Sequence, residues 1–338
     1  MKSFLINKVL LFPFYMVLRL RHALYNSGVF KTTKFDIPVI CVGNISAGGT
    51  GKTPMVEFII RELKEERRVA MLSMGYGRKS RGFRYVSIED SVADAGDEPL
   101  QIKRRYPFVT VAVDKNRVRG VKHLLKLPED KRPEVVVLDD AFQHRSISAG
   151  CNIVLVDYTR PLDKDYLLPI GGLRDLPDQI KRADVVIVTK APVELSDEES
   201  DSWRKRLKML PNQKLLFSSL KYGEAKGIFP NNNRRYLSSK YAIAITGIAN
   251  PRPFIYYLVN IYKIEMHIKF GDHYQYTKRE VRRFNKMAAK YPQAVFYTTE
   301  KDAQRLEKLQ GLSPDFTQRL FYLPIEMELL SGGLLLDF

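Results

Sequence analysis

The sequence predicts an α/β protein: a parallel sheet flanked by helices, followed by a second, smaller α/β domain. Short runs rich in Val and Ile alternate with helical segments, and the alternation resumes after an interval dense in Gly, Pro and Asn. Continuous apolar strands are typical of a sheet that is buried on both faces. At 338 residues the chain is long for one domain and sufficient for two.

Apolar runs and helical periodicity place the elements of the larger domain. The expected strands are 37–43, 68–73, 108–113, 134–140, 152–157 and 184–190. The segments 53–67, 97–106 and 116–127 have apolar residues three and four positions apart, as amphipathic helices do. We expect a polar helix near 195–211 and a further apolar run at 214–220.

The second domain repeats the alternation on a smaller scale. Its expected strands are 241–246, 265–270, 294–298 and 319–325, and its expected helices are 251–260, 278–290 and 300–309. The interval before them contains GEAKGIFPNNNRR, whose Gly, Pro and Asn residues are typical of loops. We therefore expect a core domain at 36–220, a hinge or linker at 221–240, a smaller α/β domain at 241–325, and a tail at 326–338 that is free to return to the core domain.

Net charge and cysteine content restrict the class of protein. The chain has 55 Lys and Arg against 38 Asp and Glu, a net charge of +17. Such an excess favours an anionic partner, whether nucleic acid, acidic lipid or a phosphorylated small molecule, and does not choose among them. Cys41 and Cys151 lie in apolar runs and are too few for a disulfide framework or a zinc site, so we expect buried thiols in a reducing cytoplasm.

The N-terminal segment, 1–35, is apolar, aromatic and basic. Lys8 and Pro13 interrupt it, and a basic cluster at 19–22 closes it. The uncharged stretch 9–18 has about half of the roughly 20 residues that a membrane-spanning helix needs. No small-residue cleavage site follows, so a secretory signal is not expected. Two interpretations remain: a helix packed on the protein's own core, or a helix lying in the interface of an anionic membrane, which we favour.

The stretch CVGNISAGGTGKTPMVEFII, 41–60, follows the first strand and opens the first helix. It resembles the phosphate-binding fingerprint G-x-x-x-x-G-K-[ST], except that Ser46 occupies the first glycine position. Such a loop directs backbone N–H groups at a phosphate, the lysine bridges the β- and γ-phosphates, and the threonine hydroxyl holds Mg²⁺. The expected nucleotide-binding residues are Ser46, Ala47, Gly48, Gly49, Thr50, Gly51, Lys52 and Thr53. Ser46 is tolerable there if its φ stays negative.

This loop makes the larger domain a P-loop-type core and predicts ATP and Mg²⁺ as cofactors. A P-loop enzyme also needs a carboxylate at the end of a neighbouring strand, to reach Mg²⁺ through its water shell. The run 134–140 ends in Asp139 and Asp140, which with Thr53 form the expected metal site. Adjacent residues of a strand point to opposite sides, so the sequence leaves open which aspartate faces the metal.

Eight motifs occur together in a characteristic order. They are GNISAGGTGKTP (43–54), SMGYGRKSRG (73–82), AGDEPLQI (95–102), VAVDKNRVRG (111–120), LDDAFQHR (138–145), LLPIGGLRDLP (167–177), GDHYQYT (271–277) and TTEKDAQRL (298–306). In these the chain resembles, over nearly its whole length, the tetraacyldisaccharide 4′-kinases, the lipid A 4′-kinases of Gram-negative bacteria. The resemblance implies that serine is the usual residue at the first loop position in that family.

The resemblance implies transfer of the γ-phosphoryl group of ATP to the 4′-hydroxyl of tetraacyldisaccharide 1-phosphate, giving lipid IV-A. It implies two α/β/α domains joined by a hinge, with the nucleotide between them. A glycolipid acceptor implies a peripheral enzyme at the cytoplasmic face of the bacterial inner membrane, with the anionic membrane surface as a partner. We expect no nucleic acid partner and a monomer.

The resemblance also implies roles for individual residues. Asp97 corresponds to the family's proposed catalytic base and His273 to the histidine paired with it; judged without the family, Asp97 fits a helix N-cap as well. Arg78, Arg119 and Arg174 are candidates for substrate phosphate binding because a guanidinium forms paired hydrogen bonds with phosphate. Each of these arginines also fits a solvated surface charge.

Two other classes of function remain open at this point. A P-loop kinase of a soluble sugar or nucleoside predicts no membrane association. A membrane- or nucleic-acid-associated ATPase fits the positive charge, although no RNA- or DNA-binding motif such as an RRM or a helix-turn-helix occurs in the sequence.

Overall fold

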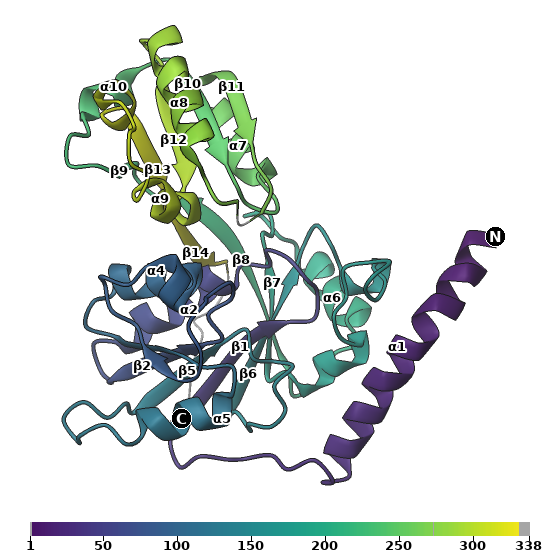
Figure 1. Ribbon diagram of the computed structural model, residues 1–338. Coiled ribbons are helices and arrows are strands. Elements are labelled where there is room, and N and C mark those ends of the chain that lie inside the picture. Colours follow the sequence, from purple (N-terminus) through teal and green to yellow (C-terminus); the bar gives the residue numbers. More distant parts are fainter. Residues whose placement is uncertain (1, 273, 331–338) are drawn as a thin grey trace. The chain divides into compact units, whose positions relative to one another are not determined.

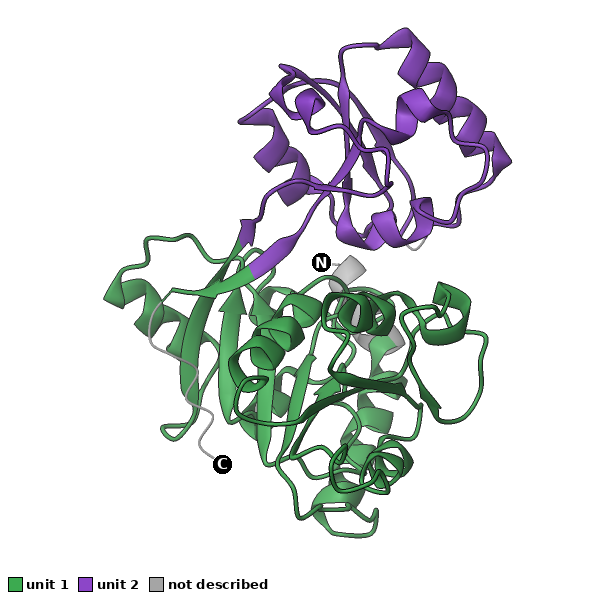
Figure 2. Ribbon diagram, turned by 90° about the vertical axis from the view of Figure 1, so that its left-hand side faces the viewer, with its two compact units in different colours: residues 1–220, 327–338 green, residues 221–326 purple. Residues whose placement is uncertain are grey.

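The computed structural model describes residues 2–272 and 274–330, with side chains described from residue 11 onward. The chain divides into two compact units, Met1–Leu220 with Met327–Phe338, and Lys221–Glu326 (Figure 2). Each unit has its own sheet and its own apolar core. The chain passes from one unit to the other within β8 (Lys214–Tyr222) and returns within β14 (Ile325–Leu329).

A nine-stranded sheet forms the first unit, in the order β14-β8-β7-β6-β1-β5-β2-β4-β3 (Figure 1). Its other strands are β1 Val39–Asn44, β2 Val69–Ser73, β3 Arg84–Tyr85, β4 Thr110–Val113, β5 Val135–Asp139, β6 Cys151–Asp157 and β7 Val185–Thr189. The pairs from β8 to β4 are parallel, and the two-residue β3 pairs antiparallel with β4. The predicted α/β fold with a parallel sheet is confirmed.

Helices cover both faces of this sheet. The first unit contains α1 Lys2–Asn26, α2 Lys52–Leu63, α3 Val92–Ala95, α4 Asp97–Arg105, α5 Arg117–Leu124, α6 Asp197–Arg206 and 3₁₀ turns at Leu162–Lys164 and Pro177–Arg182. Alternate residues of β1 divide between two cores: Ile40 and Val42 pack with α2 and α4, whereas Val39 and Cys41 pack with α1, α5 and α6. This division follows from the two-residue period of a strand.

The strand order places the glycine-rich loop at a topological switch point. After β1 the chain first builds the side of the sheet that contains β2 and β4, then fills the place of β5, and then builds β6, β7 and β8 on the opposite side of β1. In open α/β sheets, ligands bind at the carboxyl ends of the strands where the order reverses in this way. The loop 45–51 lies at that position.

The second unit has a five-stranded sheet in the order β11-β10-β12-β13-β9. Its elements are β9 Lys226–Gly227, β10 Tyr241–Thr246, α7 Arg252–Val259, β11 Lys263–Lys269, α8 Lys278–Lys290, β12 Val295–Thr299, α9 Glu300–Leu306, α10 Pro314–Thr317 and β13 Leu320–Leu323. The interval that we interpreted as a hinge is built into this unit. Within it β9 pairs with β13, and the Asn232 amide donates hydrogen bonds to the carbonyls of Thr317 and Leu320.

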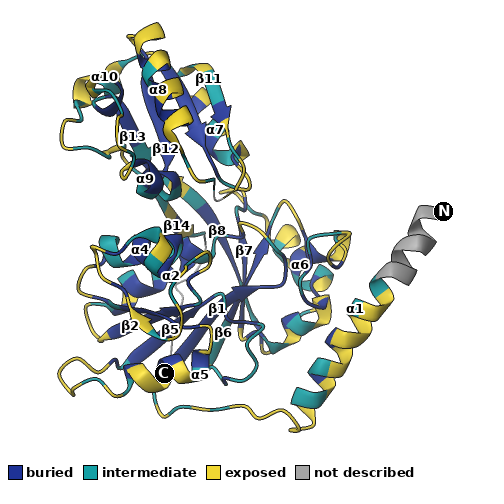
Figure 3. Cartoon of the chain, viewed as in Figure 1, coloured by how far each residue is buried: buried dark blue, intermediate teal, exposed yellow. Residues whose placement is uncertain are grey.

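Helix α1 contacts the body of the first unit along a narrow stripe. Leu18 and His22 are buried, while Phe12, Val17 and Leu20 are 60%, 61% and 61% exposed (Figure 3). The helix therefore packs on the core, as one interpretation expected, and still presents apolar side chains to solvent. Within residues 2–272 and 274–330, no helix combines the length and the hydropathy needed to cross a bilayer.

Candidate active site

The glycine-rich loop joins the end of β1 to the start of α2. Gly48 and Gly51 have φ angles of 99° and 90°, in the left-handed region that favours glycine. Ser46 does not belong to the residues with positive φ, which meets the condition set for a serine at this position. The Asn44 amide at the end of β1 donates a hydrogen bond of 2.6 Å to the Thr50 hydroxyl and so closes the loop from within.

Three side chains hold the carbonyl groups of the loop from behind. Arg160 donates to the Ala47 carbonyl at 3.1 Å, Lys190 to the Gly49 carbonyl at 2.6 Å, and the Thr189 hydroxyl to the Thr50 carbonyl at 2.9 Å. The C=O and N–H groups of a trans peptide point in opposite directions. The N–H groups that follow Ala47 and Thr50 are therefore directed away from these donors, as binding of an anion requires.

Asp139 ends β5 and lies opposite Val42 of β1 in the sheet register. Its side chain is buried and accepts a 3.0 Å hydrogen bond from the Ser73 hydroxyl on Oδ2. Its Oδ1 is also buried and has no hydrogen-bond partner within the described part of the chain. Burial raises the pKa of Asp139 to about 7, and the negative charges of Glu98 and Asp140 add to this effect.

Asp140 has a different electrostatic environment. With φ 48° it leaves the strand direction, and its carboxylate forms an ion pair with Arg174 and lies 3.7 Å from Lys52 Nζ. Burial alone would raise the pKa of Asp140, but the hydrogen bond from Arg174 and the positive charge of Lys52 hold it below its ordinary range. Asp140 thus forms an ion pair with Arg174, whereas for Asp139 the charge of Lys52 only partly offsets the effect of burial.

This donor set fits a magnesium ion. The Asp139 Oδ1 atom, which has no hydrogen-bond partner within the described residues, is a hard oxygen ligand that can bind a cation. Thr53, buried at the start of α2, offers a hydroxyl oxygen as a second ligand. The described residues contain no group of three or more His, Cys, Asp or Glu side chains suited to a metal ion. Mg²⁺ usually takes one or two protein oxygens and completes its shell with water and substrate phosphates, so Asp139 Oδ1 and the Thr53 hydroxyl form a donor set of the right kind.

Asp97 is the first residue of α4 and is buried. The residue at the N-cap is Gly96, so the Asp97 side chain does not have the capping role that the sequence allowed. A Cβ at Gly96 would lie 2.9 Å from the Tyr76 carbonyl, so the start of α4 packs directly on the turn after β2. Asp97 thereby stands at the same edge of the sheet as Ser73, the partner of Asp139. His273 lies outside the described residues.

The three arginines predicted to bind substrate phosphate, Arg78, Arg119 and Arg174, do not form one cluster. Arg119 forms two hydrogen bonds with Asp114, of 2.8 and 2.7 Å, and the Asp114 charge also acts on Arg78. Arg78 itself donates to the Gly82 carbonyl at 2.7 Å and so holds its own loop. Arg174 is separate from this pair, because its guanidinium is engaged by Asp140 and Asn44.

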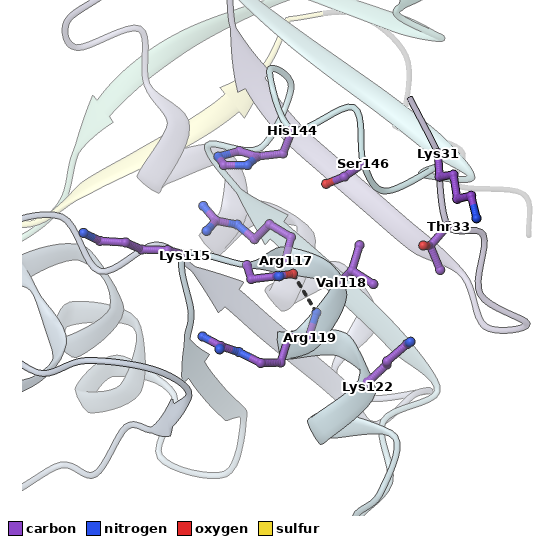
Figure 4. Close-up of a pocket in the computed structure, with 10 residues that line it drawn as sticks. Lys31, Thr33, Lys115, Arg117, Val118, Arg119, Lys122, His144 and Ser146 are labelled. Carbon is purple, nitrogen blue, oxygen red and sulfur yellow. Dashed lines mark hydrogen bonds between the residues drawn. The ribbon is translucent and has the colours of Figure 1, made fainter. Parts of the chain in front are cut away.

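A basic groove of about 680 Å³ lies at the start of α5 (Figure 4). Five cationic side chains line it together with His144: Lys31, Lys115, Arg117, Arg119 and Lys122. Arg117 is buried and donates to the carbonyls of Asp114 and Asp139, which connects the groove to the end of β5. Burial, helped by the charge of Arg117, lowers the pKa of His144 to about 4, so this imidazole is neutral at neutral pH.

Comparison with known proteins identifies the family. The model of the family described as "Tetraacyldisaccharide-1-P 4'-kinase" matches residues 5–335. The chain belongs to this family. A tetraacyldisaccharide 4'-kinase of Porphyromonas gingivalis is 43% identical over 92% of this chain and 89% of its own length, and one of Flavobacterium johnsoniae is 38% identical over 95% and 92%. A crystal structure described as an "apo" form of LpxK from Aquifex aeolicus in complex with ATP covers 95% of both chains at 28% identity, with a TM-score of 0.71.

The resemblance inferred from the motifs is therefore confirmed, as are the kinase class and the fold. Sequence reasoning missed the side chains that hold the loop in this kinase, above all Lys190 and its buried partner Asp157. A signal was present: β6 ends in Asp157, and β7 ends in Thr189 and is followed by Lys190. These polar residues lie at the carboxyl edge, where a parallel sheet forms its binding sites.

Proposed function

We propose that the protein transfers the γ-phosphoryl group of ATP to the 4′-hydroxyl of tetraacyldisaccharide 1-phosphate and so forms lipid IV-A in lipid A biosynthesis. The observation that carries this proposal is the arrangement, in a chain of this family, of a phosphate loop ending in Lys52 and Thr53 beside Asp139 and Asp140. ATP and Mg²⁺ are the cofactors. A kinase of a soluble sugar and a nucleic-acid-associated ATPase are not favoured by the family.

Each residue at the carboxyl edge of the sheet has a distinct task in this proposal. The loop N–H groups and Lys52 bind the β- and γ-phosphates, and Thr53, Asp139 and Asp140 hold Mg²⁺ directly or through water. The ion, when bound, offsets negative charge on the transferring phosphoryl group. Asp97 accepts the proton of the 4′-hydroxyl as its oxygen bonds to the γ-phosphorus and ADP leaves.

His273 is proposed to orient the Asp97 carboxylate and to share its proton. The sequence places the histidine in the second unit and the aspartate in the first, so this pairing would couple movement of the units to the chemical step. Hinge movement where β8 and β14 pass between the units, near residues 221 and 326, is part of the same proposal. Removing the imidazole, as in His273→Ala, should lower kcat less than Asp97→Ala does, because the carboxylate remains.

The basic groove is proposed to take the 1-phosphate of the acceptor. Support comes from the concentration of Lys31, Lys115, Lys122 and Arg119 around it and from its connection to Asp139 through Arg117. Arg78 would assist from its neighbouring loop. Arg174, which is already at Asp140, is proposed to contact the γ-phosphate.

The groove assignment predicts a specific kinetic change. Lys115→Ala and Lys122→Ala should each raise the KM for the lipid acceptor about 3- to 10-fold with little change in kcat, because they remove uniform binding of a phosphate group. Lys286→Ala, at an exposed position of α8, serves as the matched control. An unchanged lipid KM in both groove variants would remove the groove from the acceptor site.

The exposed apolar side of α1 is proposed to lie in the interface of the anionic inner membrane, at its cytoplasmic face. Support comes from the exposure of Phe12, Val17 and Leu20 and from the net charge of +17. In cosedimentation with phosphatidylglycerol-containing vesicles, the double change Val17→Glu and Leu20→Glu should abolish binding. Equal binding by this variant and the wild type would place the membrane contact elsewhere. In detergent we expect a monomer by light scattering.

The decisive experiment is transfer of ³²P from γ-labelled ATP to purified tetraacyldisaccharide 1-phosphate. We expect labelled lipid with the wild type and a loss of about 10²-fold or more in kcat for Asp97→Ala. No labelled lipid from folded, ATP-binding wild type would refute the function. Labelling at most of the wild-type rate by Asp97→Ala would refute only the assignment of the base.

A further inference from the structure

A buried polar chain joins α1 to the catalytic loops of the first unit. His22 lies in the last turns of α1 and is 4% exposed. Its Nε2 lies 2.7 Å from Asp175 Oδ1, and its Nδ1 lies 3.1 Å from Arg145 Nη1. A second guanidinium, that of Arg182, is close enough to act on the imidazole electrostatically.

The partners of His22 determine its protonation. A guanidinium can only donate hydrogen bonds, so Nδ1 must accept the one from Arg145. The single ring proton therefore resides on Nε2, where it is donated to Asp175. The imidazole is neutral, and burial lowers its pKa accordingly. Arg145, His22 and Asp175 thus form a chain of hydrogen bonds with one fixed direction, from guanidinium through imidazole to carboxylate.

Both ends of this chain continue into the active site. Asp175 directly follows Arg174, whose guanidinium binds Asp140 and whose main-chain N–H donates to the Ile45 carbonyl, at 2.9 Å, where the phosphate loop begins. Arg145 ends the segment that starts at Asp140. In the same segment the Gln143 amide donates at 2.8 Å to the carbonyl of Asn44, the last residue of β1.

Apolar contacts also hold α1 on the core. Leu18 is 7% exposed, and Leu11 and Phe14 pack against the same core. A buried polar chain adds little stability beyond such contacts, because desolvation of its charged ends offsets most of their attraction. These hydrogen bonds do fix the orientation of the side chains, since each bond forms in only one geometry. The chain is therefore better suited to set the position of Arg174 than to fasten the helix.

We propose that His22 is a positioning residue for phosphoryl transfer: through Asp175 and Arg145 it ties the seating of α1 to the placement of Arg174 and Asp140. The proposal rests on the proposed function, since it makes the helix assigned to the membrane a determinant of the catalytic geometry. Arg145, His22 and Asp175 then link lipid binding along α1 to the position of the carboxylates proposed to hold the metal.

The test compares His22→Leu, His22→Gln and Leu18→Ala in the full chain, with the ³²P transfer assay at saturating ATP and lipid. His22→Leu should lower kcat by about 10- to 100-fold, the usual effect of removing a group that orients a catalytic ligand, with the lipid KM within about twofold. His22→Gln retains an N–H donor toward Asp175 and an oxygen acceptor, and should recover most of the loss. Leu18→Ala removes an apolar contact of α1 but leaves His22 and its hydrogen bonds in place, and should keep kcat within about twofold while lowering the melting temperature.

Activity of the wild type establishes the function separately, so the variants report on His22 alone. Equal kcat values for His22→Leu and Leu18→Ala would show that the helix is merely anchored and would overturn the proposal. A folded His22→Gln no more active than His22→Leu would overturn it as well. If His22→Leu does not fold, Asp175→Asn takes its place: a kcat lowered at least about fivefold, roughly 1 kcal/mol, supports the proposal, and a smaller loss refutes it.

Discussion

Lys190 offers the most direct test of how the phosphate loop is held. Its ammonium group lies 2.6 Å from the Gly49 carbonyl and also binds the Asp157 carboxylate. The Lys190 side chain is 14% exposed and that of Asp157 is 2% exposed, so the pair is nearly withdrawn from water. Lys190→Met keeps the length of the side chain and removes the charge.

The size of the effect follows from this burial. Removing one member of a buried ion pair costs about 3–5 kcal/mol, because the remaining charge is left without compensation. Asp157 keeps its hydrogen bonds from the Thr159 N–H and hydroxyl, of 2.9 and 2.7 Å, so we expect a loss near the lower limit. For a unit of this size a loss of about 3 kcal/mol lowers the melting temperature by about 6–12 °C. The Gly49 carbonyl also loses its donor, and a loss of about 1 kcal/mol in ATP binding would raise the ATP KM about fivefold.

Thermal melting with and without ATP and Mg²⁺, together with the ATP KM, measures both effects. Lys286→Met on α8 is the control for loss of an exposed lysine. The double variant Lys190→Met, Asp157→Asn leaves no unpaired buried charge and should regain about 2 kcal/mol relative to Lys190→Met. A loss below about 1 kcal/mol for the single variant, or no recovery in the double, would show that the pair does not stabilise the loop.

Two further predictions concern stability. Arg319 is fully buried in the second unit and donates hydrogen bonds to four main-chain carbonyls and to Asp315. Arg319→Met should therefore lower the unfolding free energy of that unit by about 3 kcal/mol or more and leave the ATP KM unchanged. A melting temperature equal to that of the wild type would contradict this prediction. Burial lowers the pKa of His22 despite the carboxylate of Asp175 and with the help of Arg145 and Arg182, so the neutral imidazole stabilises the fold at high pH. This stability is complete above the unfolded pKa of about 6.5 and is lost as the pH falls below it. The melting temperature should therefore fall more steeply between pH 7 and 5 in the wild type than in His22→Gln, and parallel curves would refute the assignment.

Elements with strong local signals were predictable from the sequence. The six apolar runs of the larger domain all form strands, since residues such as Ile40 and Val42 alternate with Val39 and Cys41 between two buried faces. The phosphate loop was recognisable because its chemistry is compressed into eight consecutive residues, 46–53. The position of Asp139 and Asp140 near this loop was predictable for a different reason: neighbouring parallel strands end at the same edge of the sheet.

Features that depend on distant contacts were not predictable. The segment GEAKGIFPNNNRR has the composition of a linker, yet Asn232 and β9 are fixed by residues near position 320, about 90 positions away in the chain. His22 has no local pattern at all, because its partners are 123 and 153 positions distant. Asp139 and Asp140 differ in electrostatic environment partly because of Arg174, which pairs with Asp140 and which no sequence spacing connects to either aspartate.

The unusual first position of the phosphate loop also has a tertiary explanation. Ser46 forms an isolated antiparallel bridge with Leu173, and the Ala47 N–H donates to the Gly172 carbonyl at 2.6 Å. This part of the loop is therefore paired backbone rather than a free turn, and paired backbone does not require the conformational freedom of glycine. The partner segment continues into Arg174 and Asp175, the residues through which we propose that α1 reaches the metal carboxylates. Serine can therefore replace glycine at residue 46 because the backbone of the loop is held there by the segment 172–175.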